Sequence, residues 1–164
     1  MKHNCKCSIH FIILALTLSS CGAYRFNDTC IVGRKFWCAN VTDQTVEVEN
    51  ARVHYWTGGQ GEPLVMLQGF GGNARTVWAE QVVDLSDKYT LYAPDLVYFG
   101  GSTAKKKNFS IEFQVDTIIQ FLDKLNIKKC HLIGVSYGGL VAYMLSAMYP
   151  DRVEKLINYL GVRE

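Results

Sequence analysis

The chain has 164 residues, 49% of them hydrophobic, which is enough for one domain with a moderate core but not for two ordinary domains. The formal charge of +2 at pH 7 indicates no nucleic-acid partner, and the basic run Lys105–Lys107 is expected to be a solvated loop. Cysteines and histidines lack the spacing of metal ligands, so no metal and no cofactor are expected.

The first 20 residues have the pattern of an export signal. A basic start precedes the apolar run Ile9–Leu18, which is shorter than the about 20 residues needed to span a bilayer. The run leads into Leu18-Ser19-Ser20-Cys21-Gly22, which resembles a bacterial lipobox, where the cysteine is lipidated and becomes the mature N-terminus. The sequence therefore predicts an exported lipoprotein, anchored in a bacterial membrane through Cys21 on the periplasmic or cell-surface side. The alternative is an ordinary signal peptide that happens to end beside a cysteine.

Residues 21–44 are polar and irregular, and we expect them to tether a domain that spans residues 45–164. Two cysteines of the tether, Cys30 and Cys38, either pair in an oxidising compartment or remain free thiols, and both alternatives stay open. Cys130 begins an apolar strand and is expected to be a small buried hydrophobic residue rather than a reactive thiol.

From residue 45 onward the hydrophobic pattern predicts strands that alternate with helices. The six expected strands cover residues 45–49, 51–56, 64–67, 90–93, 131–135 and 156–160, and the expected helices cover residues 74–86, 111–125 and 138–149. Ser110 is placed to cap the second helix. Alternating strands and helices imply parallel β-α-β units. The sequence thus predicts an α/β fold with a mostly parallel sheet, helices on both faces, and an end after about the sixth strand.

The main chemical signal is Gly134-Val135-Ser136-Tyr137-Gly138, a G-x-S-x-G pattern between an apolar strand and a helix. A serine on a tight strand-to-helix turn projects its hydroxyl above the sheet, and the strained turn requires small neighbours, here Gly134 and Gly138. The helix N-terminus behind the serine favours developing negative charge. The alternative is a glycine-rich turn without catalytic function, but the strand and helix around the pattern favour a nucleophile.

A second glycine-rich loop, Leu67–Asn73, follows the expected strand at residues 64–67. Glycines at positions 69, 71 and 72 permit a close approach to the serine. A backbone N–H of this loop, together with that of Tyr137, would stabilise a tetrahedral oxyanion by about 3–4 kcal/mol per donor. A simple turn between a strand and a helix would need fewer glycines.

Together these segments resemble the α/β-hydrolase superfamily, specifically its serine-nucleophile esterases and lipase-like members. The matching stretches are PLVMLQGFGG, YTLYAPDLVYFGGS and KKCHLIGVSYGGLVAYMLSAMYPDRVEKLIN, and the resemblance extends from about residue 45 to the end. It implies Ser136 as the nucleophile, Phe70 and Tyr137 as backbone donors of the oxyanion hole, and a structural role for Asp95. The implied substrate is a small-molecule carboxylic ester, cleaved through an acyl-enzyme without a cofactor.

The chain departs from the superfamily pattern at Gln68, where histidine is usual, at Tyr98, where glycine is usual, and after Ser136. In this superfamily the triad acid and histidine follow the serine, but no histidine follows Ser136. His54 lies in the first strand pair, and His131 is roughly 15 Å from Ser136 along its strand, so neither is expected to be the base. We therefore expect this chain to be the N-terminal part of an ester hydrolase, with catalysis impaired because the triad acid and the triad histidine are absent from it. The alternative is a truncated, non-catalytic lipoprotein or interaction domain.

Overall fold

The computed structural model describes residues 32–159 of the chain. The expected signal peptide, the lipidation site Cys21 and the residue Cys30 all lie outside this described part. Within it, no helix is both long enough and apolar enough to cross a membrane.

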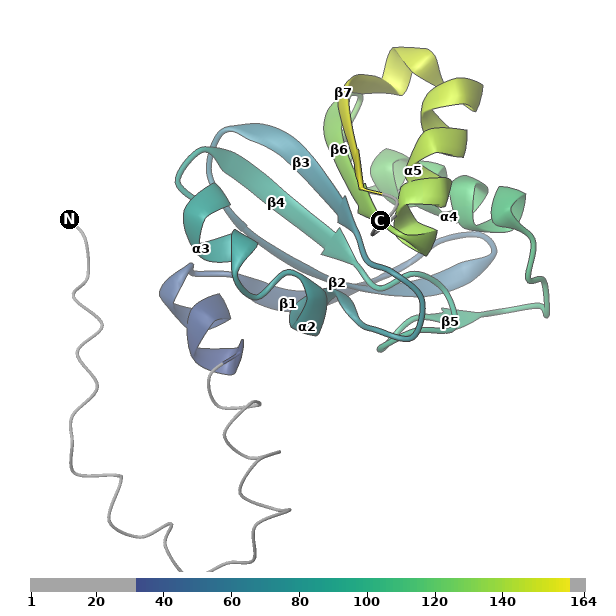
Figure 1. Cartoon of the computed structure of the whole chain (residues 1–164). Coiled ribbons are helices and arrows are strands. Elements are labelled where there is room, and N and C mark those ends of the chain that lie inside the picture. Colours follow the sequence, from purple (N-terminus) through teal and green to yellow (C-terminus); the bar gives the residue numbers. More distant parts are fainter. Residues whose placement is uncertain (1–31, 160–164) are drawn as a thin grey trace, which may run out of the picture.

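The described residues form one mixed sheet with helices on both faces, which confirms the predicted fold class (Figure 1). The strands are β1 Thr42–Glu47, β2 Ala51–Gly59, β3 Glu62–Leu67, β4 Tyr89–Pro94, β5 Thr103–Ala104, β6 Cys130–Val135 and β7 Val153–Tyr159. Besides a helical stretch at residues 32–38, the helices are α2 Ala74–Val77, α3 Gln81–Leu85, α4 Ile111–Lys124 and α5 Tyr137–Met148, followed by the 3-10 turn η2 Pro150–Arg152.

The strand order is β1-β2-β4-β3-β6-β7, and the two-residue strand β5 pairs with β2. Strands β3, β4, β6 and β7 run parallel to one another, whereas β2 is antiparallel to β1, β4 and β5. The carboxyl ends of β3 and β6 therefore lie side by side, with Leu67 paired to Gly134. This register brings the two glycine-rich loops of the sequence to the same edge of the sheet.

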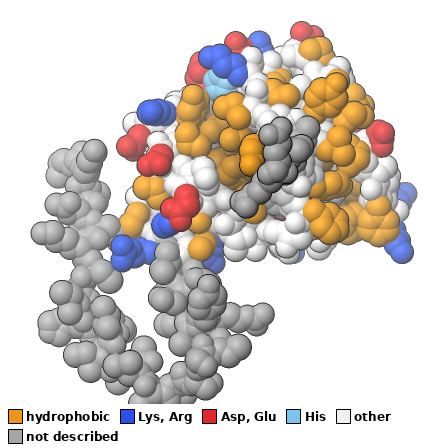
Figure 2. Space-filling view, in the orientation of Figure 1, with side chains coloured by type: hydrophobic (Ala, Val, Ile, Leu, Met, Phe, Trp, Pro, Cys, Tyr) orange, Lys and Arg blue, Asp and Glu red, His pale blue; other side chains and the backbone are white. Residues whose placement is uncertain are grey.

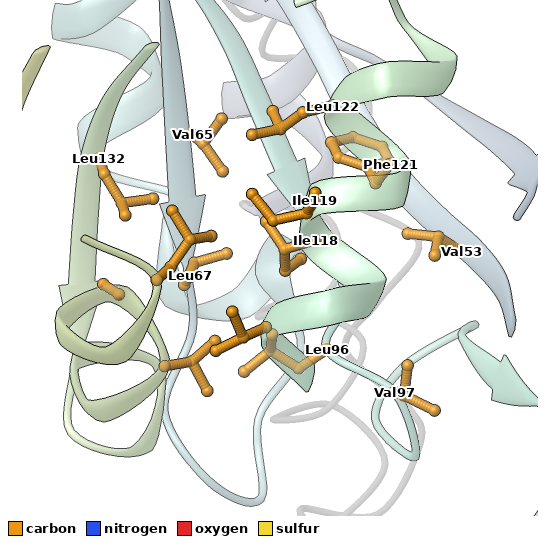
Figure 3. Packing of buried hydrophobic residues seen from close by; sticks show 14 of the residues in the cluster. Val53, Val65, Leu67, Leu96, Val97, Ile118, Ile119, Phe121, Leu122 and Leu132 are labelled. Carbon is orange, nitrogen blue, oxygen red and sulfur yellow. The ribbon is translucent and has the colours of Figure 1, made fainter. Parts of the chain in front are cut away.

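Two apolar clusters, one on each face of the sheet, form the core. Strand β3 supplies both, because Val65 and Leu67 enter the cluster beneath α4 and α5, whereas Leu64 and Met66 enter the other. Figure 3 shows the first cluster, in which Ile118 and Leu122 of α4 reach the side chains of β3 and β6. Helix α4 begins where the sequence predicts, since the Ser110 hydroxyl accepts the Phe113 N–H at 3.1 Å.

The thiol of Cys130 lies in this first cluster, as the sequence predicts. Burial raises its pKa from 9.0 to about 11, and the charge of Arg152 offsets only part of that effect. Because the thiolate is the reactive form, a raised pKa agrees with the expected role of Cys130 as a small buried hydrophobic residue.

The folded part begins earlier than the residue 45 expected from the sequence. Residues 32–38 are helical, and Phe36 and Val41 are buried in the second cluster. The Phe36 ring packs edge-on against Trp56 of β2, with ring centroids 4.8 Å apart. Residues 32–44 are thus part of the domain rather than of a tether. Phe36 and Val41 are enough to attach this polar segment to the domain, because both side chains pack into the apolar cluster on one face of the sheet.

The predicted helix at residues 74–86 is divided into α2 and α3. At the break, Trp78 leaves the helical conformation (φ −103°, ψ 9°). Ala74, Trp78 and Val82 are nevertheless all buried in the second cluster. These three residues keep the i, i+4, i+8 spacing of a continuous helix, so the break at Trp78 could not be predicted from the hydrophobic pattern.

Exposed apolar side chains gather where α5 and β7 lie (Figure 2). They are Leu140, Tyr143 and Met148 of α5 and Ile157 and Tyr159 of β7. Strand β7 is the last strand of the sheet in the described part of the chain, and Ile157 and Tyr159 lie on the face of the second cluster, because they pair with Ile133 and Val135. This side of the sheet therefore has apolar surface open to solvent.

Candidate active site

Ser136 lies between the end of β6 and the start of α5, with its side chain exposed. Its backbone has φ 53° and ψ −119°, a conformation that L-residues rarely adopt and that costs about 1–3 kcal/mol. Pairing with the neighbouring strand supports the turn, since the Ser136 N–H donates to the Tyr159 carbonyl at 2.8 Å. The result is a serine hydroxyl held above the carboxyl edge of a parallel sheet, where ligands bind in open α/β folds.

The two glycines of the pattern permit the close packing around this turn. A Cβ on Gly134 would lie 2.5 Å from the carbonyl oxygen of Gly138. A Cβ on Gly138 would overlap the carbonyl oxygens of Leu67 and Gln68. The first turn of α5 therefore lies directly against the end of β3, where the second glycine-rich loop begins.

The loop at residues 69–73, called the 69–73 loop below, passes beside Ser136. A Cβ on Gly69 would lie 3.4 Å from the Cβ of Ser136, and Gly71 has a φ of +78°. The Phe70 side chain is 79% exposed, and its ring packs edge-on against Phe99 and Tyr137, with centroids 5.2 and 6.0 Å away. Phe70, Ser136 and Tyr137, which the sequence analysis singled out together, are thus neighbours.

The hydroxyl of Tyr137 is held by a hydrogen bond with Gln114. Partial burial raises the pKa of its hydroxyl, and a hydrogen bond with Gln114 opposes the rise. Gln114 is itself buried in α4 and holds the backbone of Val97 at both groups, accepting from the N–H at 3.1 Å and donating to the C=O at 3.0 Å. A polar side chain among the buried positions of α4 is the signal that could have drawn attention to Gln114 in the sequence.

Both ends of the 69–73 loop are attached to the segment that follows β4. At the near end, Gln68 is fully buried, and with its amide oriented to suit both neighbours it donates to the Pro94 carbonyl and accepts from the Leu96 N–H, each at 2.9 Å. At the far end, Asp95 accepts the N–H of Ala74 at 2.7 Å. Asp95 is 2% exposed, and its carboxylate is taken up by His54 and by the backbone N–H groups of Ala74 and Gly101, which supports a structural role.

The histidines of the described part are engaged away from Ser136. His131 is the second residue of β6, its Nε2 lies 2.9 Å from Glu62 Oε2, and its ring packs edge-on against Tyr89. His54 lies in β2, with its ring between Asp95 and Asp43. Among residues 32–159, no three His, Cys, Asp or Glu side chains are grouped so as to hold a metal ion.

Residues 62–159 match the family model described as alpha/beta hydrolase fold. The chain belongs to this family. Over 120 residues it is 32% identical to the (E)-2-((N-methylformamido)methylene)succinate hydrolase of Acinetobacter baylyi, a match that covers 73% of the chain and 45% of that enzyme. Over 101 residues it is 37% identical to the pimeloyl-[acyl-carrier protein] methyl ester esterase of Aeromonas hydrophila, covering 61% of the chain and 38% of the esterase.

Among solved structures, this α/β-hydrolase is similar to a membrane phospholipase A described as a bacterial virulence factor. The TM-score is 0.71 at 25% sequence identity, and the match covers 83% of the chain and 46% of the phospholipase. The α/β-hydrolase chain thus spans less than half the length of these relatives.

Proposed function

We propose that this α/β-hydrolase is a serine hydrolase that acts on small-molecule carboxylic esters through an acyl-enzyme at Ser136. The observation that carries the proposal is the backbone of Ser136, whose positive φ holds an exposed hydroxyl at the N-terminus of α5. The proximity of Gly69 supports it further, because a loop with backbone amides then passes beside the reacting atom.

In the proposed reaction, the Ser136 hydroxyl oxygen attacks the ester carbonyl carbon while its proton passes to a base. The backbone N–H groups of Phe70 and Tyr137 donate to the oxyanion of the tetrahedral intermediate. Collapse of the intermediate breaks the ester C–O bond, and the alcohol leaves with the proton. Water then attacks the acyl-enzyme in the same way, releasing the acid and restoring the serine.

The base is the part of this mechanism that the described residues do not supply. The ring of His54 contacts Asp95 and that of His131 contacts Glu62, and a serine hydroxyl without a base is a poor nucleophile at neutral pH. An oxyanion hole and substrate binding alone retain roughly 10³–10⁴-fold catalysis over water. This engagement of both histidines favours a second candidate function, a non-catalytic interaction domain derived from such a hydrolase.

Labelling with a fluorophosphonate tests the proposal. We expect the phosphonyl group on the peptide that contains Ser136, and no labelling of the Ser136→Ala variant, because the reagent reacts with a serine that is activated and lies beside oxyanion donors, as the proposed reaction requires. Peptide mass spectrometry after protease digestion gives the readout. The matched control is Ser146→Ala, also in α5, whose hydroxyl donates to the Ala142 carbonyl at 2.8 Å. This control is expected to label like the parent chain.

Equal labelling of Ser136→Ala and the parent chain would exclude Ser136 as the nucleophile. A parent chain that neither labels nor hydrolyses a nitrophenyl ester would favour the interaction domain.

We also propose that the chain is exported and anchored in a bacterial membrane through a lipid on Cys21. The lipobox-like sequence supports this proposal, and acyl chains contribute about 0.8 kcal/mol per buried CH₂. In bacteria fed an alkyne fatty acid, we expect label on the parent chain and on the Cys7→Ser control, whose cysteine leaves with the signal peptide. The Cys21→Ser variant should carry no label, and its labelling to the parent level would refute the anchor.

A further inference from the structure

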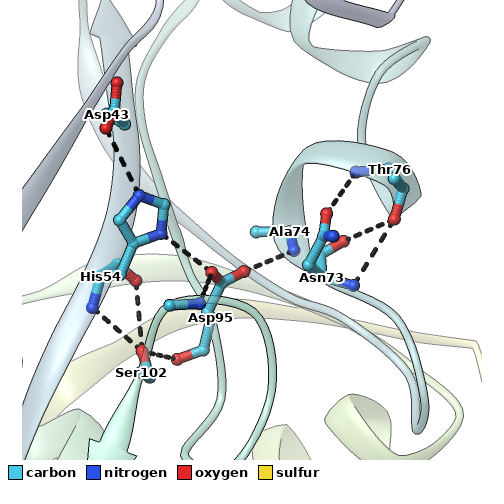
Figure 4. Close-up of polar contacts among 8 residues, drawn as sticks. Asp43, His54, Asn73, Ala74, Thr76, Asp95 and Ser102 are labelled. Atoms are coloured by element: carbon cyan, nitrogen blue, oxygen red, sulfur yellow. Dashed lines mark hydrogen bonds and ion pairs between the residues drawn. The ribbon is translucent and has the colours of Figure 1, made fainter. Parts of the chain in front are cut away.

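The ring of His54 lies between two carboxylates, those of Asp95 and Asp43 (Figure 4). His54 lies in β2, and its Nδ1 donates to the Oδ2 atom of Asp95 at 2.8 Å. The Nε2 atom lies 3.5 Å from Oδ2 of Asp43, a residue of β1 whose side chain is 62% exposed. The contact with Asp95 is therefore the short and buried one, and the contact with Asp43 is the long and solvated one.

His54 has little freedom to move away from Asp95. A Cβ added to Gly101 would lie 2.8 Å from the Cγ of His54, so the ring packs directly on the backbone there. On another side it packs edge-on against Trp56, with centroids 5.8 Å apart. The Gly101 N–H also donates to Oδ2 of Asp95, at 2.9 Å.

The second oxygen of Asp95 extends this chain of hydrogen bonds to the 69–73 loop. It accepts the N–H of Ala74 at 2.7 Å, and Ala74 is the first residue of α2. Immediately before it, Asn73 ends the loop and caps α2, accepting the Thr76 N–H at 2.9 Å. The Asp95 carboxylate therefore joins the end of the loop, through Ala74, to the ring of His54 and the N–H of Gly101.

Ser102, His54 and Asp95 include the residue types of a catalytic triad but not its geometry. The Ser102 hydroxyl accepts the backbone N–H of His54 at 3.0 Å and donates to the backbone carbonyl of Asp95 at 2.7 Å. The imidazole therefore does not activate this hydroxyl, and Ser102 is not a second nucleophile. What the ring holds is the carboxylate of Asp95.

We infer that His54 is a positioning residue for the oxyanion loop, acting through Asp95 and the Ala74 amide to hold the 69–73 loop beside Ser136. The inference rests on the proposed function for the identity of the loop as an oxyanion loop. His54 touches no substrate in this role. Its imidazole keeps one buried carboxylate pointed at the amide that ends the loop.

A matched pair of variants separates the two nitrogens of the ring. In His54→Asn the amide nitrogen takes the place of Nδ1 and can still donate to Asp95, whereas in His54→Gln it takes the place of Nε2 and faces Asp43. Both side chains are neutral, polar and small enough for the site. Asp43→Asn serves as the control for the solvated contact.

The primary readout is hydrogen exchange of the backbone amides at residues 69–76, measured by mass spectrometry on the full chain. In His54→Gln we expect exchange of these amides, Ala74 included, to be about tenfold faster than in His54→Asn, the equivalent of one hydrogen bond to a charged group. Asp43→Asn should exchange like the parent chain. Equal exchange in the Asn and Gln variants, or an acceleration spread evenly over the whole chain, would overturn the inference.

The rate of fluorophosphonate labelling at Ser136 is the second readout. It should fall in His54→Gln and be retained in His54→Asn. A parent chain that neither labels nor hydrolyses a nitrophenyl ester refutes the proposed function and leaves the exchange result to decide the role of His54. Equal labelling rates in the two variants, with a parent chain that does label, would refute the positioning role alone.

Discussion

Gly138→Ala is expected to lower the free energy of unfolding by about 3 kcal/mol, a cost at the upper end of the overpacking range. The added Cβ would overlap the backbone carbonyl oxygens of Leu67, the last residue of β3, and of Gln68 directly after it, and backbone atoms cannot rotate away as a flexible side chain can. Alanine is favoured over glycine inside a helix by only about 0.5–1 kcal/mol, so the clash outweighs the gain in helix propensity. Urea unfolding followed by circular dichroism measures the difference.

Gly69→Ala is the matched control for this prediction. Its Cβ would meet Ser136 Cβ at 3.4 Å and the Val135 carbonyl oxygen at 3.5 Å, which are ordinary contacts. We expect less than about 1 kcal/mol of destabilisation from it. A Gly138→Ala variant as stable as Gly69→Ala would show that α5 does not pack against the end of β3 as described.

The strands and the serine turn could be predicted because their signals are local. β3 and β6 are short apolar runs that end in glycine-rich turns. A continuous apolar run bounded by turn residues is the pattern typical of a strand that is covered on both faces. The pattern around Ser136 spans five residues, and its glycines are required by contacts at the turn itself. Such features depend little on the rest of the fold.

The features that sequence reasoning missed depend on partners far along the chain. The helix at residues 32–38 is stable only against Trp56 and the second cluster, and by itself it reads as an irregular segment. Strand β5 has two residues and exists through its pairing with β2. His54 and Asp95 are 41 positions apart, and no periodicity links a histidine in one strand to a carboxylate after another.

Asp95→Ala is expected to destabilise the domain by about 3–5 kcal/mol, because it leaves several buried donors without an acceptor. The carboxylate accepts the backbone N–H groups of Ala74 and Gly101 and the ring of His54, all at 2.9 Å or less. Few waters can replace it, since the residue is 2% exposed. Urea unfolding measures the loss, and fluorophosphonate labelling of Ser136 should fall with it, since the Ala74 amide ends the 69–73 loop.

Asp43→Ala is the control for Asp95→Ala, because it also removes a carboxylate from the ring of His54 but at a solvated position. Both aspartates contact the ring of His54, but Asp43 does so at 3.5 Å with a 62% exposed side chain. Even a full ion pair at such a solvated position contributes at most about 1 kcal/mol, so removing Asp43 should change stability little. If Asp43→Ala destabilised the domain as much as Asp95→Ala, a carboxylate next to the ring of His54 would be what matters. The hydrogen bonds from Ala74 and Gly101 to Asp95 would then not explain its contribution to stability. The attachment of the 69–73 loop through Asp95 would then have no energetic basis.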